Sequence, residues 1–93
     1  MAPQAREDLE NIYLEIAKDN PQAAVAFMQN LTEQIAELAF LGVDGSPRGW
    51  ISKGLRAFPY RERCFYFRID GNNFFLLRVL HGKQDIPNQF SED

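Results

Sequence analysis

The expected fold of this chain rests mainly on one stretch, Phe74-Phe75-Leu76-Leu77-Arg78-Val79-Leu80-His81-Gly82-Lys83-Gln84-Asp85-Ile86-Pro87. From Phe74 to Leu80 it is apolar on both faces apart from Arg78, which is typical of a strand covered on both sides. A polar corner follows, and Asp85-Ile86-Pro87 opens a helical turn that should end near Phe90. We therefore expect a covered strand that delivers several polar side chains to one edge of a sheet.

Two further strands are expected before this one. Residues 63–69 alternate, with Phe65, Phe67 and Ile69 on one face, and residues 70–73 are typical of a hairpin turn. Residues 54–58 predict a shorter strand, which should end in a turn over residues 59–62. Three glycines, a proline and an aspartate between Gly42 and Trp50 predict a loop.

The N-terminal half has the periodicity of two helices. Apolar residues at three- and four-residue spacing predict one helix over residues 4–18 and a second from Pro21 to about Gly42, with Asn20 as its N-cap. The short connection predicts an antiparallel helical hairpin. The expected fold class is α+β: a single domain over residues 1–93, in which an N-terminal helical hairpin packs on one face of a small three-stranded antiparallel β-meander sheet.

Composition narrows the functional classes. The chain has 93 residues, 45% of them hydrophobic, which suits one domain with a modest core. It shows no apolar run of about 18 residues and no secretory signal, so we expect no membrane span and a cytoplasmic location. The net charge of −3 argues against a surface built to grip phosphates, although eight of the ten basic residues lie between Asp44 and Asp93. The single cysteine, Cys64, is expected to fill a small apolar space.

Four segments, in the same order along the chain, resemble the RelE/ParE superfamily of toxins from type II toxin–antitoxin pairs, and its ParE branch most closely. They are Pro3-x-Ala5-x-x-Asp8-Leu9-x-x-Ile12, Ile16-Ala17-x-Asp19-Asn20-Pro21-x-Ala23-Ala24, Gly54-Leu55-Arg56 before Phe58-Pro59, and Leu77-Arg78-Val79-Leu80-His81-Gly82-x-x-Asp85-Ile86-Pro87. Together they span nearly the whole chain.

The resemblance implies a cytoplasmic toxin that a cognate antitoxin holds inactive, with no cofactor or metal and no sequence-specific nucleic-acid binding. In the ParE branch the target is DNA gyrase, whose cleaved-DNA complex is trapped. In the RelE branch the toxin cuts mRNA in the ribosomal A site. Family members usually begin with a β-strand, which is missing ahead of Pro3 here. Either the sheet has three strands, or the true start lies upstream, or a partner chain fills the open edge.

The side chains favour the ParE branch. The resemblance places Gln84 where a RelE-type nuclease has an arginine, Phe90 where it has a tyrosine, and Ser52 and Gly54 where it has a lysine pair. RNA cleavage needs groups that move protons and groups that stabilise phosphate charge. We therefore expect a gyrase inhibitor without catalytic residues of its own. The alternatives are a degenerate, non-toxic member and a ribosome-dependent mRNA endonuclease that uses Arg56, Arg61, Arg63 and His81 around a phosphate.

Two sets of binding residues are expected. The candidate target-binding residues are Arg78, His81, Lys83, Gln84 and Phe90, and the candidate antitoxin-binding residues are Leu9, Tyr13, Phe27, Leu31 and Trp50. Structural alternatives stay open: Arg78 could pair with a carboxylate such as Glu62 or Asp85, His81 could close the strand through a backbone hydrogen bond, and Trp50 could fill the core. The stripe on the second helix is either core or a groove for an antitoxin segment that is disordered when free.

Overall fold

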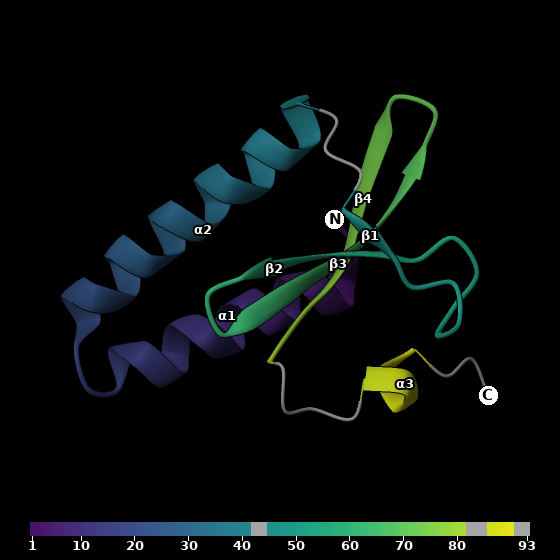
Figure 1. Ribbon diagram of the computed structural model, residues 1–93. Coiled ribbons are helices and arrows are strands. Elements are labelled where there is room, and N and C mark those ends of the chain that lie inside the picture. The colour runs from purple at the N-terminus through teal and green to yellow at the C-terminus, as the bar shows by residue number, and fades with distance from the viewer. Residues whose placement is uncertain (42–44, 82–85, 91–93) are drawn as a thin grey trace.

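The structure, a computed structural model, describes residues 1–41, 45–81 and 86–90 (Figure 1). Its helices are α1 (Pro3–Ala17), α2 (Pro21–Leu41) and α3 (Ile86–Gln89). Its strands are β1 (Ser46–Pro47), β2 (Arg56–Tyr60), β3 (Arg63–Asp70) and β4 (Asn73–His81). The α+β class and the order of a helical hairpin before a meander are confirmed. The predicted helix stop, Gly42, lies outside the described residues.

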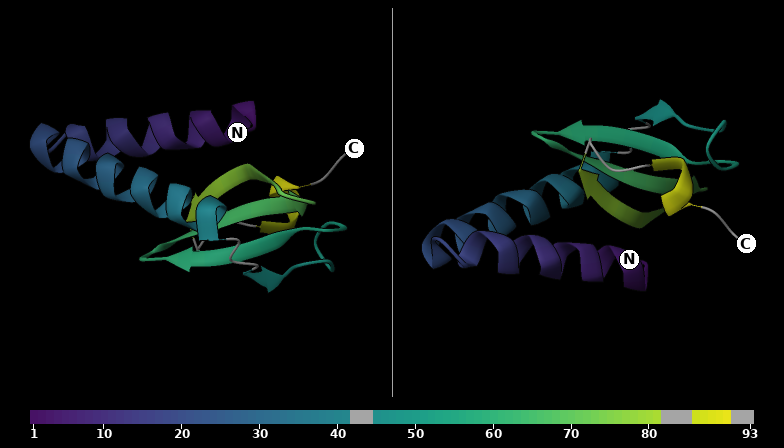
Figure 2. Two further views of the ribbon diagram at one scale, coloured as in Figure 1. Left: turned by 90° about the horizontal axis from the view of Figure 1, so that it is seen from above. Right: turned by 90° about the horizontal axis from the view of Figure 1, so that it is seen from below.

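The two long helices start where proline and asparagine predict. Pro3 occupies the first turn of α1, where its missing N–H leaves no helical hydrogen bond unmade. Asn20 caps α2 as expected, because its side-chain Oδ1 accepts a hydrogen bond from the backbone N–H of Ala23 at 3.1 Å. A connection of three residues separates the helices, so they run antiparallel, and both lie to one side of the sheet in the two views of Figure 2.

The sheet has four strands rather than the predicted three. All neighbours are antiparallel in the order β1-β2-β3-β4, and β1 lies within the segment expected to be a loop. Gly45 explains how this short strand reaches β2, because a Cβ at Gly45 would lie 2.5 Å from the carbonyl oxygen of Ala57. With φ at +64°, Gly45 also adopts a conformation that glycine accepts without strain.

Strand β2 runs two residues further than predicted and includes Pro59, which was expected to begin a turn. The carbonyl oxygen of Leu55 accepts a hydrogen bond from the backbone of Arg48, so positions 55, 57 and 59 direct their backbone polar groups away from β3. The missing N–H of Pro59 would therefore point away from β3, on the side of β2 where the two-residue strand β1 pairs only with Arg56 and Ala57. The proline thus costs no hydrogen bond between β2 and β3.

Both faces of the sheet are covered. The helical face carries the larger core, made of Ala5, Ile12, Leu31, Leu38, Phe65, Phe67, Leu76 and Val79. The opposite face buries Leu55, Ala57, Tyr66 and Leu80. Ile51, which precedes β2 in sequence, and Ile86 and Phe90, which follow β4, pack against them. Strand β4 contributes to both cores, as its apolar sequence predicts. A bulge at Leu77 explains why Leu76 and Val79, three residues apart, face the same core.

The outer edge of β4 is the place that a further strand would take, and in the described residues the start of α1 covers part of it. The backbone N–H of Ala2 donates to the carbonyl oxygen of Leu76 at 2.9 Å. The Asp8 carboxylate accepts a hydrogen bond from the backbone N–H of Val79 at 3.0 Å. No strand precedes α1 within the described residues. The middle of this edge is thus blocked by the chain's own first helix.

Candidate functional site

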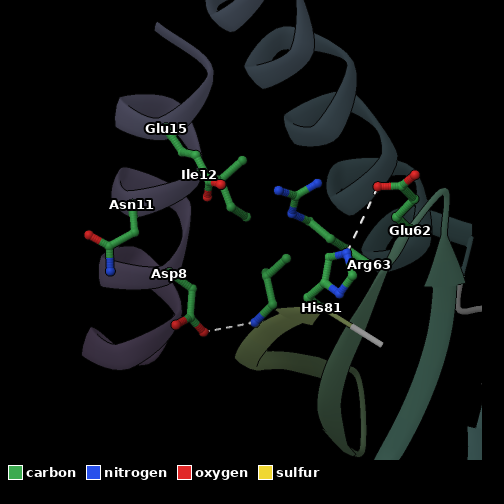
Figure 3. A pocket seen from close by; sticks show the side chains of 8 residues that line it. Asp8, Asn11, Ile12, Glu15, Glu62, Arg63 and His81 are labelled. Atoms are coloured by element: carbon green, nitrogen blue, oxygen red, sulfur yellow. Dashed lines mark hydrogen bonds and ion pairs between the residues drawn. The ribbon is translucent and has the colours of Figure 1, made fainter. Parts of the chain in front are cut away.

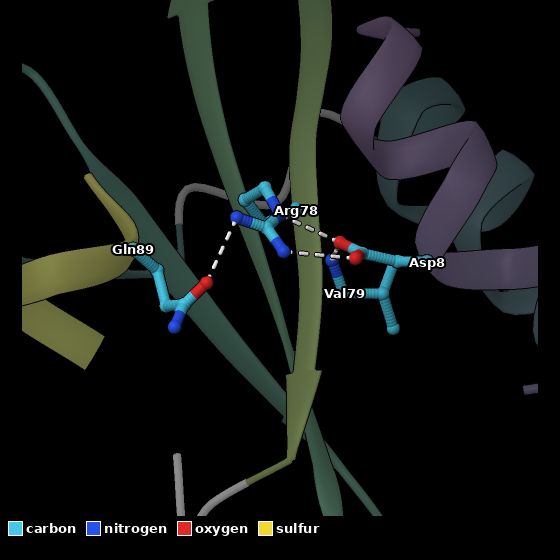
Figure 4. A network of polar contacts seen from close by, with 4 residues as sticks. All are labelled: Asp8, Arg78, Val79 and Gln89. Atoms are coloured by element: carbon cyan, nitrogen blue, oxygen red, sulfur yellow. Dashed lines mark hydrogen bonds and ion pairs between the residues drawn. The ribbon is translucent and has the colours of Figure 1, made fainter. Parts of the chain in front are cut away.

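Arg78 is the centre of a polar network that joins three elements (Figure 4). Its Nε lies 2.8 Å from Asp8 Oδ2 and its Nη2 lies 2.9 Å from Asp8 Oδ1, so the guanidinium and the carboxylate form a two-pronged pair. Its Nη1 donates to Gln89 Oε1 at 3.2 Å. The network ties α1, β4 and α3 together through one side chain.

The structural alternative for Arg78 therefore holds, but with a different carboxylate. The predicted partner was Glu62 or Asp85, whereas the observed partner is Asp8, and Asp85 lies outside the described residues. The pair is largely covered, with side-chain exposures of 14% for Arg78 and 12% for Asp8. The hydrogen bond to Asp8 raises the pKa of Arg78 above its ordinary value, and burial opposes that rise. Sequence reasoning missed Asp8 because it is 70 residues away on the first helix.

A polar pocket of about 480 Å³ opens beside this network, between α1 and the ends of β3 and β4 (Figure 3). His81 lies here, with its Nε2 3.9 Å from Glu62 Oε2. Arg63 extends from β3 toward α1 in the same view. The pocket is lined by Asp8, Asn11, Ile12, Glu15, Glu62, Arg63, Val79 and His81. It brings carboxylates and cations together, so it can bind a charged group from a partner.

The four residues of the endonuclease alternative do not gather around one point. Arg61 and Arg63 both lie over the ring of Phe27, with Cζ-to-centroid distances of 5.6 and 5.3 Å. His81 pairs across the sheet from Arg63. Arg56 pairs across from Phe67, four positions along β2 from Tyr60, which is roughly 13 Å at the usual rise of a strand.

The other predicted target-binding residues divide into buried and undescribed ones. Phe90 packs on the second face of the sheet, with its ring centroid 5.2 Å from that of Tyr66. It therefore supports the fold with most of its ring and offers the remainder at the surface. Lys83 and Gln84 lie outside the described residues.

The predicted antitoxin-binding residues also differ in accessibility. Leu31 is completely buried, so it belongs to the core and cannot contact a partner in this conformation. Leu9 and Phe27 are half-buried against the same core. Trp50 is 75% exposed, so the alternative that it fills the core is wrong, and its side chain is accessible to a partner.

The helical hairpin has a groove, but most of its lining residues differ from the stripe on the second helix that the sequence suggested as core or groove. The groove has a volume of about 700 Å³, and Tyr13 is the predicted residue that takes part in it. The other lining residues are Val25, Met28, Gln29, Thr32, Glu33 and Ala36. Their spacing of three and four residues along α2 is a second stripe, next to the buried one, and this spacing is the signal that could have revealed the groove.

The surface near the end of α2 is also more apolar than expected. Phe40 is 88% exposed and Leu41 is 60% exposed, and neither was singled out from the sequence. Large exposed apolar side chains that cluster are typical of binding surfaces.

In the part of the chain that the structure describes, no group of three or more His, Cys, Asp or Glu side chains could hold a metal ion. Burial raises the pKa of the Cys64 thiol, which makes it less reactive. Burial also raises the pKa of its neighbour Tyr66, to about 12. None of the described helices is long and apolar enough to cross a membrane.

Comparison with known proteins agrees with this architecture. The chain's fold matches a chain from the structure described as the chromosomal ParDE TA system from P. aeruginosa, with a TM-score of 0.71 and 24% identity over 86% of this chain and 89% of the other. A search of the curated proteins finds no match. A family model described as the ParE toxin of the type II toxin–antitoxin system, parDE, matches residues 1–86. With that match over nearly its whole length, and with the helical hairpin and antiparallel sheet in place, the chain belongs to the ParE toxin family of type II toxin–antitoxin systems.

Proposed function

We propose that this toxin acts by binding DNA gyrase and trapping its cleaved-DNA complex, and that it does so in the cytoplasm. Membership of the ParE family is the starting point. The observation that carries the proposal is how the charged side chains are used. Arg78, the one lysine or arginine of strand β4, makes a two-pronged pair with Asp8 rather than pointing to a substrate.

The remaining side chains also suit binding better than catalysis. Phe90, at the position expected for a tyrosine in a nuclease, has no proton to give and packs on Tyr66. Arg56 is separated along β2 from the end of the strand that faces Arg63. General acid–base cleavage needs its groups within hydrogen-bond reach of one phosphate. We infer that the toxin contacts its target through side chains around the C-terminal end of β4, including His81, Lys83 and Gln84.

The antitoxin is proposed to bind the helical hairpin. The groove lined by Tyr13, Val25 and Met28 has a volume of about 700 Å³, which gives room for side chains of an amphipathic segment. Val25 is 47% exposed, so the groove offers apolar surface that a partner would bury. Trp50 does not line this groove. It is exposed and is proposed as a further anchor, because exposed tryptophans are frequent hot spots.

The proposed target is tested by a supercoiling assay with purified gyrase and relaxed plasmid. Toxin should inhibit supercoiling in proportion to its concentration, and addition of the cognate antitoxin should restore it. Primer extension on an actively translated message is the parallel assay for the endonuclease alternative. Cuts within codons, together with full gyrase activity, would replace the proposed target by the ribosome. Harmless overexpression without antitoxin would instead favour a degenerate member.

A further inference from the structure

The turn between β2 and β3 contains a residue that is unusual for its position. Arg61 begins the two-residue turn between Tyr60 and Arg63 and has a φ of +57°. Among the described residues other than glycine, no other has a positive φ. This conformation costs an ordinary L-residue about 1–2 kcal/mol, and glycine, asparagine or aspartate is usual in such turns. A long cationic side chain kept in a strained turn indicates that the side chain has a role there.

The guanidinium groups of Arg61 and Arg63 converge on one aromatic ring. The Cζ atom of Arg61 lies 5.6 Å from the centroid of the Phe27 ring, and the Cζ atom of Arg63 lies 5.3 Å from the same centroid. Arg61 Cζ also lies 5.3 Å from the centroid of Tyr60. Cation–π attraction favours each contact separately. The two positive charges nevertheless repel each other, so their convergence is favourable when an anion is near.

No carboxylate from the described residues forms an ion pair with either arginine. Neither guanidinium makes a hydrogen bond or ion pair within residues 1–41, 45–81 and 86–90. The carboxylate nearest in sequence, Glu62, lies instead 3.9 Å from His81 Nε2. A guanidinium that stacks on an aromatic face keeps its in-plane N–H donors, which match a planar carboxylate.

We propose that Arg61 and Arg63, held on Phe27, form a recognition site for one or two carboxylate side chains of the antitoxin. This proposal rests on the proposed function, because it assumes an antitoxin as the partner. Phe27 and Met28 are neighbours on α2, and Met28 lines the open groove of the helical hairpin. A single antitoxin segment can therefore lie in the groove and place an acidic residue on the two arginines.

Nearby charges favour a protein carboxylate over a nucleic acid. The adjoining pocket contains Glu15 and Glu62 on either side of Arg63, as Figure 3 shows. A continuous run of phosphates would meet these like charges one step beyond the arginines. A protein segment can place a carboxylate on the arginines and a neutral or basic side chain toward Glu15 and Glu62.

Four toxin variants test the site against the cognate antitoxin by isothermal titration calorimetry. Arg61→Gly removes one guanidinium and relaxes the turn, and Arg63→Gln removes the other. Arg6→Ala removes one positive charge from an exposed position on α1 and is the matched control. Each of the first two should weaken antitoxin binding about tenfold or more, and Arg6→Ala should change it less than twofold. Arg61→Lys keeps the charge but not the planar fork, so it should restore only part of the affinity.

The thermal midpoint of Arg61→Gly separates binding from folding. Because glycine accepts the positive φ, the thermal midpoint of this variant should be close to that of the natural toxin or above it, while its affinity for the antitoxin should be lower. If the natural toxin binds and both variants bind as tightly as Arg6→Ala, the carboxylate site is wrong and the toxin–antitoxin pairing stands. If the natural toxin itself does not bind, the site and the proposed partner fall together.

Two further arms identify the anion. Each Asp or Glu of the antitoxin is changed to Asn or Gln and combined with Arg61→Gly in a double-mutant cycle. At one acidic position, the substitution should weaken binding to the natural toxin but should weaken binding to Arg61→Gly little further. If the effects of the two substitutions on the binding free energy simply add at every acidic position, the proposed site is wrong. Single-stranded RNA and inorganic phosphate are titrated separately. If RNA binds the natural toxin tightly and does not bind Arg61→Gly, the two arginines recognise a phosphate rather than a carboxylate, and the proposal is wrong.

Discussion

Asp8 in α1 and Arg78 in β4, 70 residues apart in sequence, are joined by two parallel hydrogen bonds of 2.8 and 2.9 Å. The same carboxylate accepts the outward backbone N–H of Val79. One aspartate thus neutralises the largely covered cation of the edge strand β4 and covers part of that edge of the sheet. This relationship explains how α1 stays attached where a further strand would otherwise pair.

Replacement of Asp8 by alanine should destabilise the toxin by about 3 kcal/mol, because it leaves a largely covered guanidinium and a backbone N–H without their partner. Asp8→Asn should destabilise it less, since the amide oxygen still accepts one hydrogen bond. Urea unfolding followed by circular dichroism measures both. Glu10→Ala removes another exposed carboxylate from α1 and is the control. Equal midpoints for Asp8→Ala and Glu10→Ala would contradict a stabilising role for the pair.

Three glycine-to-alanine substitutions separate close packing from backbone strain. At Gly45 an added Cβ would lie 2.9 Å from Phe67 Cζ and even closer to the backbone of Ala57, and φ is +64°. At Gly71 φ is +61° with no atom within 4 Å, and at Gly49 there is likewise open space. The loss of stability should be largest for Gly45→Ala, about 1 kcal/mol for Gly71→Ala, and near zero for Gly49→Ala. A thermal melt that ranks Gly45 with Gly49 would show that β1 does not pack as described.

Alkaline pH should destabilise the toxin through Tyr66. Its phenol has a pKa raised by burial to about 12, against an ordinary value of 10.0, so the unfolded chain loses this proton first. The contribution of Tyr66 to stability is therefore complete below pH 10 and declines as pH rises toward about 12. Spectrophotometric titration at the tyrosinate band should show a late component that Tyr66→Phe removes. A titration of Tyr66 at its ordinary pKa in the folded toxin would refute its burial.

A charge placed in the groove of the helical hairpin should block the antitoxin without unfolding the toxin. Val25→Glu introduces a carboxylate at an exposed groove position, and glutamate is a good helix former. Antitoxin affinity should fall at least tenfold with little change in the thermal midpoint. Ala26→Glu makes the same kind of change at the next residue of α2, which does not line the groove. Equal losses for both variants would place the antitoxin elsewhere.

Local patterns predicted most of the fold. The helices, the cap at Asn20, the β3–β4 hairpin and the final helical turn follow from periodicity, turn residues and proline positions near them in sequence. β1 was missed because two residues carry no periodic signal, and its pairing depends on a close approach at Gly45 that sequence alone does not show. Pro59 was predicted to begin a turn, because a strand accepts a proline only where its missing N–H faces away from the paired neighbour, and the sequence does not show that direction.

The site was less predictable because it depends on contacts between distant residues. That Arg78 could pair with a carboxylate was foreseeable from its apolar neighbours, but the identity of Asp8 requires knowledge of how α1 crosses β4. Leu31 and Val25 lie on the same helix, and the spacing of their stripes does not say which one faces the sheet. The stacking of Arg61 and Arg63 on Phe27 also joins α2 to the hairpin, so no local pattern announces it.

The most direct test of gyrase as the target is a gyrase cleavage assay on supercoiled plasmid, stopped with detergent and protease. Toxin alone should cause linear DNA to accumulate with gyrase covalently attached to its ends, and prior addition of antitoxin should prevent this. Plasmid that stays intact at saturating toxin, while the same preparation arrests growth when antitoxin is withheld, would contradict gyrase as the target.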